Sequence, residues 1–285
     1  MRDFRIGLAQ INPRLGDIEA NLEKHLEYIE MARNAGCDLV VFPELSLTGY
    51  FLRDLVYDAA IDPYGGFLDP LIAQTGDITV IFGFVHHTPE HTFKSAAAYV
   101  EDGMILHVHH KVYLVTYGLF DEGRYLARGD SIRTVDGKFG RQSILICEDL
   151  WHPTTAAISA IDGADVIHGI SCSPGRGVAG GGAELGSIST WRDLNKIYAQ
   201  LFTGYQVFSH RVGYEDGVNF PGGSEVLGPE GDVLVRASAD GEELVVADLT
   251  DSALRRARIK VPLRRDENLD LVLRELQRIF EERYV

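Results

Sequence analysis

The sequence predicts a layered α/β domain, in which helices cover a mixed β-sheet, from three observations. In the first part of the chain, short apolar runs alternate with amphipathic segments, as strands alternate with helices. Later β runs are closely spaced and separated by turn residues, which indicates antiparallel hairpins. The length of 285 residues, of which 45% are hydrophobic and 24% charged, allows a sizeable core in one large domain or two small ones.

Apolar periodicity places the first elements. Residues 17–35 carry apolar side chains on one helical face, with Asp17 as the N-cap and Gly36 as the stop signal. Apolar runs without this period predict buried strands. We expect strands over 4–11, 38–42 and 78–85, and a helical stretch near 64–74.

Turn residues place the later elements. The sequence Glu101-Asp102-Gly103 separates two β runs and predicts a hairpin, and similar turns separate three β runs near the end of the chain. The expected strands are 95–100, 104–109, 139–146, 165–170, 205–210, 224–227, 233–237 and 244–249, and the expected helices are 183–201, 251–259 and 269–284.

Composition excludes several classes of protein. The net charge of −15, from 27 basic and 42 acidic residues, argues against a nucleic-acid partner. The three cysteines, Cys37, Cys147 and Cys172, have no repeating spacing and are not a disulfide framework. No apolar run approaches the ~18 residues of a membrane span, and the first residues lack a signal-peptide pattern. We therefore expect a cytoplasmic protein without a membrane partner.

Cys147 ends an apolar run and precedes the acidic segment Glu148-Asp149-Leu150-Trp151. A strand that turns sharply into a helix holds a nucleophile out of the sheet, and the first N–H groups of the helix favour the thiolate. Cys147 taken alone is also consistent with a buried, unreactive cysteine.

Two further polar residues each follow an apolar run. Partial burial of Glu44 at the rim of a sheet raises its pKa and makes it a better base, although a carboxylate there can also be a cap or a surface group. Lys111 can stabilise the oxyanion of a tetrahedral intermediate, although a lysine after a strand is often a solvated charge. Acyl transfer requires a nucleophile, a base and an oxyanion stabiliser, which are the groups that these three residues supply.

Glu44, Lys111 and Cys147, in this order, resemble the Glu-Lys-Cys triad of the nitrilase (carbon–nitrogen hydrolase) superfamily. The resemblance runs from about residue 4 to about residue 250 and is closest to the glutaminase-domain branch of glutamine-dependent NAD synthetase. With the chain ending at Val285, we expect amide hydrolysis rather than NAD synthesis. The segments that resemble family motifs are 42–44, 120–125, 129–130, 147–151, 211–217 and 221–224.

The resemblance implies a four-layer αββα sandwich over residues 1–258, and a C-terminal extension over 259–285 that lies at the interface of a homodimer or higher homo-oligomer. It implies hydrolysis of an amide or carbamoyl carbon–nitrogen bond in a small substrate. The reaction passes through a thioester on Cys147 and releases ammonia or an amine. No cofactor and no metal are implied.

The resemblance also assigns roles to single residues. Glu44 is the expected base, and Lys111 and the backbone N–H of Glu148 form the expected oxyanion hole. Glu122 matches the second glutamate of the family, which positions the substrate and the lysine. Residues expected to form pocket walls, or to serve packing alone, are Tyr50, Tyr117 and Trp151.

Two alternatives remain open: a glutaminase subunit that supplies ammonia to a separate synthetase, and a catalytically silent binding protein on the same fold.

Four residues differ from those typical of the family or its synthetase branch, and we expect them in loops near the pocket. They put specificity for glutamine in doubt. The sequence leaves open whether the substrate is an amide, a carbamoyl compound or a nitrile. Val115 and Arg128 replace proline, and Gly169 and His210 replace asparagine.

Two patterns resemble binding motifs but do not fit them. Gly175, Gly177 and Gly180 satisfy G-x-G-x-x-G, but they do not directly follow the strand, and no acidic residue stands ~20 positions further on. His107 and His109 share a strand face, but no cysteine or carboxylate has a matching spacing. We expect neither a dinucleotide nor a metal ion at these residues.

Overall fold

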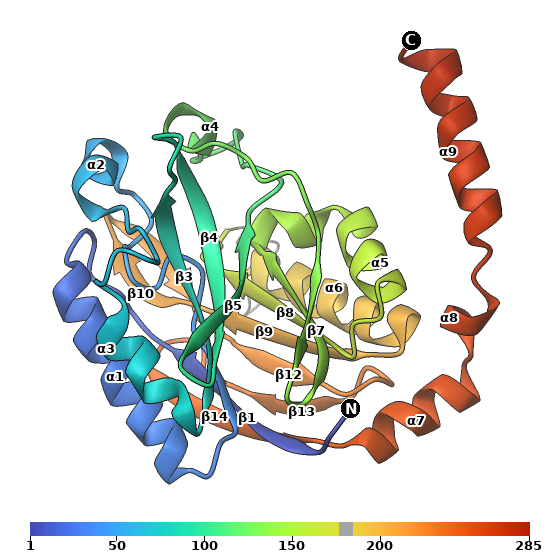
Figure 1. Ribbon diagram of the computed structural model, residues 1–285, viewed down its shortest axis with the longest axis horizontal. Helices are drawn as coiled ribbons and strands as arrows, with labels where there is room; N and C mark the ends of the chain where they lie inside the picture. The colour runs from blue at the N-terminus through green and yellow to red at the C-terminus, as the bar shows by residue number, and fades with distance from the viewer. Residues whose placement is uncertain (177–184) are drawn as a thin grey trace.

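The computed structural model, which describes residues 1–176 and 185–285, contains two six-stranded sheets stacked face to face (Figure 1). In spatial order, the first sheet consists of β14 (Glu243–Leu249), β1 (Phe4–Gln10), β2 (Leu39–Val41), β3 (Thr79–His87), β4 (Phe93–Glu101) and β5 (Met104–His110). The second consists of β13 (Val233–Arg236), β12 (Glu225–Leu227), β9 (Tyr205–His210), β8 (Val166–Ser171), β7 (Gly140–Ile146) and β6 (Thr134–Gly137).

Helices cover the outer faces of both sheets. Helices α1 (Ile18–Asn34) and α3 (Asp69–Ile72) pack beside the first sheet, and α5 (Pro153–Ile161) and α6 (Gly186–Phe202) pack on the second (Figure 1). The four-layer αββα sandwich expected from the sequence is confirmed. The smaller elements are α2 (Val56–Ala59), α4 (Glu122–Tyr125), the hairpin β10 (Val212–Glu215) and β11 (Val218–Pro221), α7 (Asp251–Lys260), α8 (Leu263–Asp266) and α9 (Leu269–Arg283).

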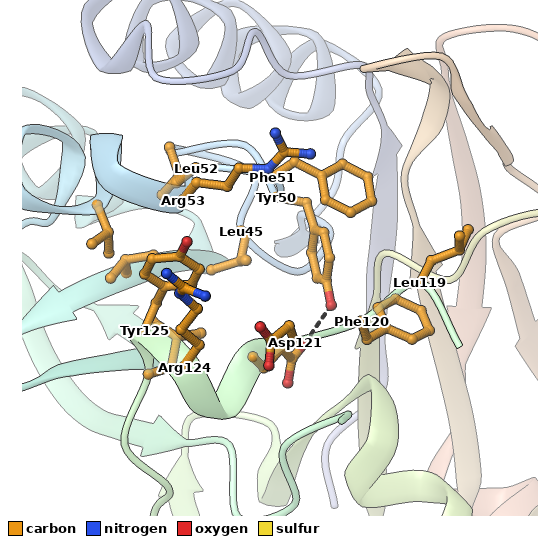
Figure 2. A pocket seen from close by; sticks show the side chains of 14 residues that line it. Leu45, Tyr50, Phe51, Leu52, Arg53, Leu119, Phe120, Asp121, Arg124 and Tyr125 are labelled. Atoms are coloured by element: carbon orange, nitrogen blue, oxygen red, sulfur yellow. Dashed lines mark hydrogen bonds between the residues drawn. The ribbon is translucent and has the colours of Figure 1, made fainter. Parts of the chain in front are cut away.

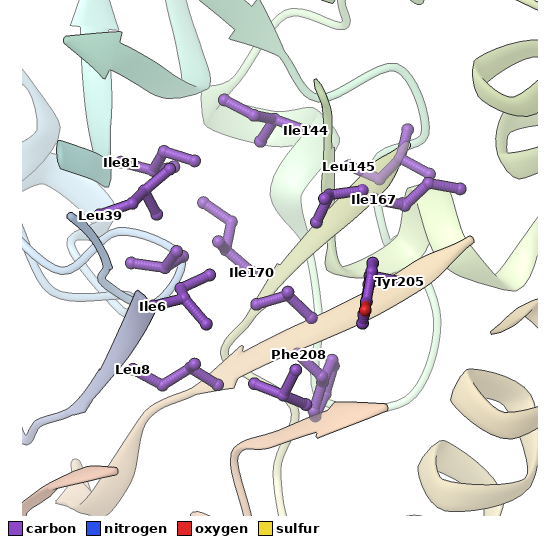
Figure 3. Packing of buried hydrophobic residues seen from close by; sticks show 14 of the residues in the cluster. Ile6, Leu8, Leu39, Ile81, Ile144, Leu145, Ile167, Ile170, Tyr205 and Phe208 are labelled. Carbon is purple, nitrogen blue, oxygen red and sulfur yellow. The ribbon is translucent and has the colours of Figure 1, made fainter. Parts of the chain in front are cut away.

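Branched aliphatic side chains fill the space between the sheets (Figure 3). Ile6 and Leu8, two residues apart on β1, are fully buried in this layer together with Ile170 of β8. On the opposite face of the first sheet, Phe82 and other residues pack with the apolar face of α1. Side chains of alternate residues leave opposite faces of a strand, so the first sheet is apolar on both sides and is buried on both.

Strand directions bring several strand ends to one region. In the first sheet β2 and β3 are parallel, and two antiparallel steps through β4 give β5 the same direction as β3. In the second sheet β7, β8 and β9 are parallel. The carboxyl ends of β2 and β5 therefore lie at one edge of the first sheet, and those of β7 and β8 at one edge of the second.

Gly83, in the middle of β3, allows the loop after β2 to pack directly against the backbone of β3. A Cβ atom there would lie 2.4 Å from the backbone nitrogen of Leu45 and 2.7 Å from the carbonyl oxygen of Pro43. Real Cβ atoms do not approach backbone this closely, so a side chain at position 83 would displace residues 43–45. The close approach fixes the backbone that carries Glu44.

The sequence located most elements but missed several. The helix predicted near 64–74 is shorter, since only α3 and a 3₁₀ turn at Ala73–Gly76 form there. Strand β6, helix α5 and the β10–β11 hairpin were not predicted. Gly177 and Gly180 of the glycine pattern lie outside the described residues. The predicted 183–201 helix corresponds to α6 within the described part.

Helix α9 stands away from the rest of the molecule (Figure 1). The side chain of Asn268 caps its start by accepting from the N–H of Leu271, and none of the helix's residues is buried. Among the described residues, no helix combines the length and the apolar character needed to cross a membrane.

Substitution of Ile170 by alanine tests the core between the sheets. Ile170 is fully buried, so the substitution should leave a cavity and lower the free energy of unfolding by about 2–5 kcal/mol. Urea unfolding followed by circular dichroism measures this change. Met104→Ala, at an exposed position, is the control and should change stability by less than about 0.5 kcal/mol. Equal effects of the two substitutions would contradict the packing described.

Candidate active site

Lys111, directly after β5, lies between two carboxylates with its side chain fully buried. Its Nζ atom donates to Oε1 of Glu44 and to Oε1 of Glu122, each at 2.7 Å. Burial alone lowers the pKa of a lysine, but the two carboxylates outweigh it and raise the pKa of Lys111 well above its usual value. The side chain is therefore an ammonium at neutral pH.

Glu44 is held by both of its carboxylate oxygens. Oε1 accepts from Lys111, and Oε2 accepts from the backbone N–H of Cys172 at 2.8 Å. The Cys172 thiol donates to the carbonyl oxygen of Glu44 at 2.7 Å. Burial raises the pKa of the Glu44 carboxyl above its usual value although Lys111 opposes this, and the higher basicity suits a group that accepts a proton.

Cys147 occupies the turn between β7 and a 3₁₀ helix over Cys147–Trp151. Its backbone has φ of 46°, a left-handed conformation that costs a non-glycine residue about 1–3 kcal/mol. The hydroxyl of Ser171, at the end of β8, donates to the Cys147 sulfur at 3.3 Å. The sulfur is thus placed at the facing edges of the two sheets, where it lies within the electrostatic influence of Glu44 and Lys111.

The prediction that a following helix favours the Cys147 thiolate is wrong. Cys147 itself begins a 3₁₀ helix of only five residues, and α5 begins at Pro153. Burial, reinforced by the Glu44 carboxylate, raises the pKa of the Cys147 thiol well above its usual value, and Lys111 only partly opposes this. At rest the group is a neutral thiol that needs a base.

Glu122, the first residue of α4, completes the charged cluster. Its Oε1 also accepts from the Tyr50 hydroxyl at 2.6 Å, and its Oε2 accepts from the backbone N–H of Val115 at 2.9 Å. A proline at position 115 would have no N–H to donate, so the valine there provides Glu122 with this hydrogen bond.

Asp149 was not predicted as a site residue, and it joins the segments that carry Lys111 and Cys147. Its buried carboxylate accepts from the backbone N–H groups of Val112 and Tyr113 at 2.9 and 3.0 Å, and from that of Ile146 at 3.0 Å. The ring of His109 lies 2.9 Å from the same carboxylate. The feature of the sequence that could have identified Asp149 is its position, two residues after Cys147.

His109 therefore has a structural partner. Across residues 1–176 and 185–285, no group of three or more histidine, cysteine, aspartate or glutamate side chains is arranged to hold a metal ion.

The predicted pocket residues divide into two groups. Tyr50 contacts Glu122, and the Tyr117 hydroxyl lies 3.1 Å from both carboxylate oxygens of Glu148, next to Cys147. Trp151 is 41% exposed, and its ring packs edge-on against Trp191 of α6 at 5.2 Å. Tyr50 thus contacts the charged cluster and Tyr117 contacts Glu148 beside Cys147, whereas Trp151 lies toward α6.

A cavity of about 270 Å³ opens beside the cluster (Figure 2). Tyr50 and Glu122 form part of its wall, and Leu52, Phe120 and other apolar side chains form much of the rest. Cys147 is not among the described residues that line this cavity. The cavity therefore borders the site on the side of Glu122.

Comparisons with known proteins found a family match and several relatives. The family model described as carbon–nitrogen hydrolase matches residues 5–259. A glutamine-dependent NAD(+) synthetase from Thermotoga maritima is 34% identical over 254 residues, which are 87% of this chain and 42% of the synthetase. The chain thus spans less than half the length of this relative.

Solved structures show the same fold. A glutamine-dependent NAD+ synthetase from Acinetobacter baumannii superimposes with a TM-score of 0.78 at 29% identity, covering 89% of this chain and 47% of that one. An amidase of the nitrilase superfamily from Nesterenkonia sp. AN1 has a TM-score of 0.80 at 21% identity, with 95% and 96% of the two chains covered. In that structure, the acetamide moiety of fluoroacetamide is covalently added at the active-site cysteine.

Ionisation of Cys147 can be measured directly. Because its pKa is raised, the thiol should stay protonated through neutral pH and ionise only above the usual thiol range. The ultraviolet absorbance of the thiolate, taken as the difference between wild type and Cys147→Ala across a pH titration, reports this ionisation. A thiolate signal from Cys147 already present at neutral pH would contradict the geometry.

Proposed function

The chain belongs to the carbon–nitrogen hydrolase (nitrilase) superfamily, and we propose that it hydrolyses an amide or carbamoyl bond of a small substrate through a thioester on Cys147. The observation that carries this proposal is the buried ammonium of Lys111, bonded to Glu44 and Glu122 beside the sulfur. The three groups supply the base, the oxyanion stabiliser and the nucleophile that acyl transfer needs.

The first half of the reaction forms the thioester. Glu44 takes the proton of the Cys147 thiol as the sulfur attacks the substrate carbonyl carbon, so that ionisation of the buried thiol accompanies attack. The negative oxygen of the tetrahedral intermediate is stabilised by the Lys111 ammonium and the backbone N–H of Glu148. The carbon–nitrogen bond then breaks, and Glu44 returns its proton to the leaving nitrogen.

The second half releases the acid. Glu44 takes a proton from a water molecule, and the resulting hydroxide attacks the thioester carbonyl carbon. The same two donors stabilise the second oxyanion. The carbon–sulfur bond breaks, Cys147 recovers a proton from Glu44, and the carboxylic or carbamic acid leaves. Glu122 holds the Lys111 ammonium in place throughout, because it accepts from Nζ at 2.7 Å.

A glutaminase subunit is the second candidate function. It is favoured by the similarity to glutamine-dependent NAD(+) synthetases and by the partly buried Glu148 carboxylate next to Cys147, which suits a substrate with an ammonium group. Stimulation of glutamine hydrolysis by a separate synthetase chain would support this alternative. Inertness toward glutamine in the presence of a synthetase, with activity on other amides, would exclude it.

We also propose that α9 joins two copies of the chain. Its apolar residues recur at helical spacing on one face, which no part of the described chain covers. Exposed apolar side chains on α5 and α6 offer a matching surface beside the base of α9. The α9 face comprises Leu269, Val272, Leu273, Leu276 and Phe280, and the facing residues of the second copy are Ile158, Ile161, Ile197 and Leu201.

Replacement of Cys147 by alanine tests the chemistry. Ammonia release is first screened over ω-amides, carbamoyl amines, ureido acids and nitriles. Cys147→Ala should lower kcat on the best substrate by roughly 10⁴-fold or more, because no other group replaces the nucleophile. Cys37→Ala, which removes a buried cysteine on the α1 side of the first sheet, should keep the activity. Full activity of Cys147→Ala would end the proposal.

Two matched substitutions on α9 test the assembly. Leu273→Glu places a charge on the apolar face and should convert a dimer into a monomer in size-exclusion chromatography with light scattering. Leu271→Glu makes the same change on the opposite face of the helix and should leave the dimer intact. A wild-type protein that is monomeric at all concentrations, or a dimer insensitive to Leu273→Glu, would refute the proposed interface.

A further inference from the structure

We propose that Arg211 and Glu215 form a buried positioning pair that holds Tyr50, and through it Glu122 and Lys111, in the arrangement needed for reaction. Both residues lie in the 211–217 segment, whose sequence resembles a family motif and for which no role has been derived above. The inference rests on the proposed hydrolysis and assigns these two residues an indirect part in it.

Arg211 is the first link. Its side chain is fully buried, and its Nη1 donates to Oε2 of Glu215 at 2.7 Å. Nη2 donates to Oδ1 of Asn12 at 2.9 Å, and the guanidinium lies 4.2 Å from the centroid of the Phe220 ring. A guanidinium without solvent requires a compensating charge, and the nearly buried Glu215 provides it.

Glu215 is the second link, and it reaches the loop after β2. Its other oxygen, Oε1, accepts from the backbone N–H groups of Tyr50 at 2.9 Å and Phe51 at 2.7 Å. Gly49 allows this approach, because its φ is +80° and a Cβ atom there would lie 2.8 Å from Cα of Leu15 and 3.1 Å from Oε2 of Glu215. One carboxylate thus ties the β10–β11 hairpin to the backbone that carries Tyr50.

Tyr50 is the third link. Its hydroxyl donates to Oε1 of Glu122, the same oxygen that accepts from Lys111. Burial and the nearby Glu122 and Glu44 carboxylates raise the pKa of the Tyr50 hydroxyl well above its usual value, so this group stays a neutral donor. Hydrogen bonds to the backbone and to the hydroxyl of Tyr50 therefore connect Arg211 and Glu215 on one side with Glu122 and the catalytic ammonium on the other.

Arg211 and Glu215 are positioning residues, because they form hydrogen bonds with other protein groups and not with the Cys147 sulfur or the reacting atoms. Loss of the Glu215 charge leaves a buried guanidinium uncompensated and weakens the hold on two backbone N–H groups. The consequence at the site is a Tyr50 hydroxyl that no longer fixes the Glu122 carboxylate. Since Glu122 aligns the oxyanion-stabilising ammonium, we expect the loss in kcat rather than in KM.

The test compares Glu215→Gln, Tyr50→Phe and the double variant, with kcat and KM measured on the best amide. Glu215→Gln should lower kcat about 10- to 100-fold with KM changed by less than about threefold. Because both substitutions interrupt the same connection, the double variant should be no more than about twofold slower than the slower single variant. Unchanged kcat in Glu215→Gln, or losses that multiply in the double variant, would overturn the inference.

A matched control separates positioning from general damage. Glu225 of β12 is also a buried carboxylate and pairs with Arg236 at 2.8 Å. Glu225→Gln should lower the melting temperature while leaving kcat unchanged, and an equal fall in kcat would overturn the inference. If Glu215→Gln does not fold, Glu215→Asp keeps the charge but shortens the reach to Tyr50, and the same outcomes apply. A wild-type enzyme inactive on every amide would instead refute the proposed function.

Discussion

The fully buried ammonium of Lys111, which two carboxylates contact, constrains the rest of the site. Removing a charge from water costs several kcal/mol, and the cost is met here only because Glu44 and Glu122 neutralise it. Two carboxylates and one ammonium leave an excess of negative charge next to Cys147. Burial, reinforced by this negative charge, raises the pKa of both the Cys147 thiol and the Glu44 carboxyl, which suits the proton transfer of the proposed reaction.

The sandwich makes this convergence possible. Glu44 and Lys111 follow strands of one sheet, and Cys147 and Ser171 belong to the strand ends of the other. Face-to-face packing of the sheets brings these ends together, and Asp149 joins the segments of Lys111 and Cys147 by hydrogen bonds to both. The apolar layer between the sheets thus determines the relative position of groups that are distant in the sequence.

Local patterns in the sequence were sufficient to predict the layered fold and most strands. They marked Cys147, Glu44 and Lys111 only as candidates, and the resemblance to the nitrilase superfamily assigned their roles. The sequence did not predict the electrostatics of Cys147, because the raised pKa depends on burial beneath another sheet. The contact of Glu215 with Tyr50 was also missed, since 165 residues separate the partners. Contacts between residues so far apart produce no periodic pattern in the sequence. Helix α9 was predicted from its pattern, whereas only the three-dimensional structure shows that no surface among the described residues covers it.

The protonation state of Lys111 is the most direct test of this account. In protein labelled with ¹⁵N at lysine side chains, the Nζ resonance of Lys111, assigned by its loss in Lys111→Met, reports its charge as the pH is raised. The account predicts an ammonium signal that persists through and beyond the usual lysine pKa of 10.5, while exposed lysines titrate. If Lys111 loses its proton at or below that pH, the two carboxylates do not raise its pKa, and the proposed arrangement would be wrong.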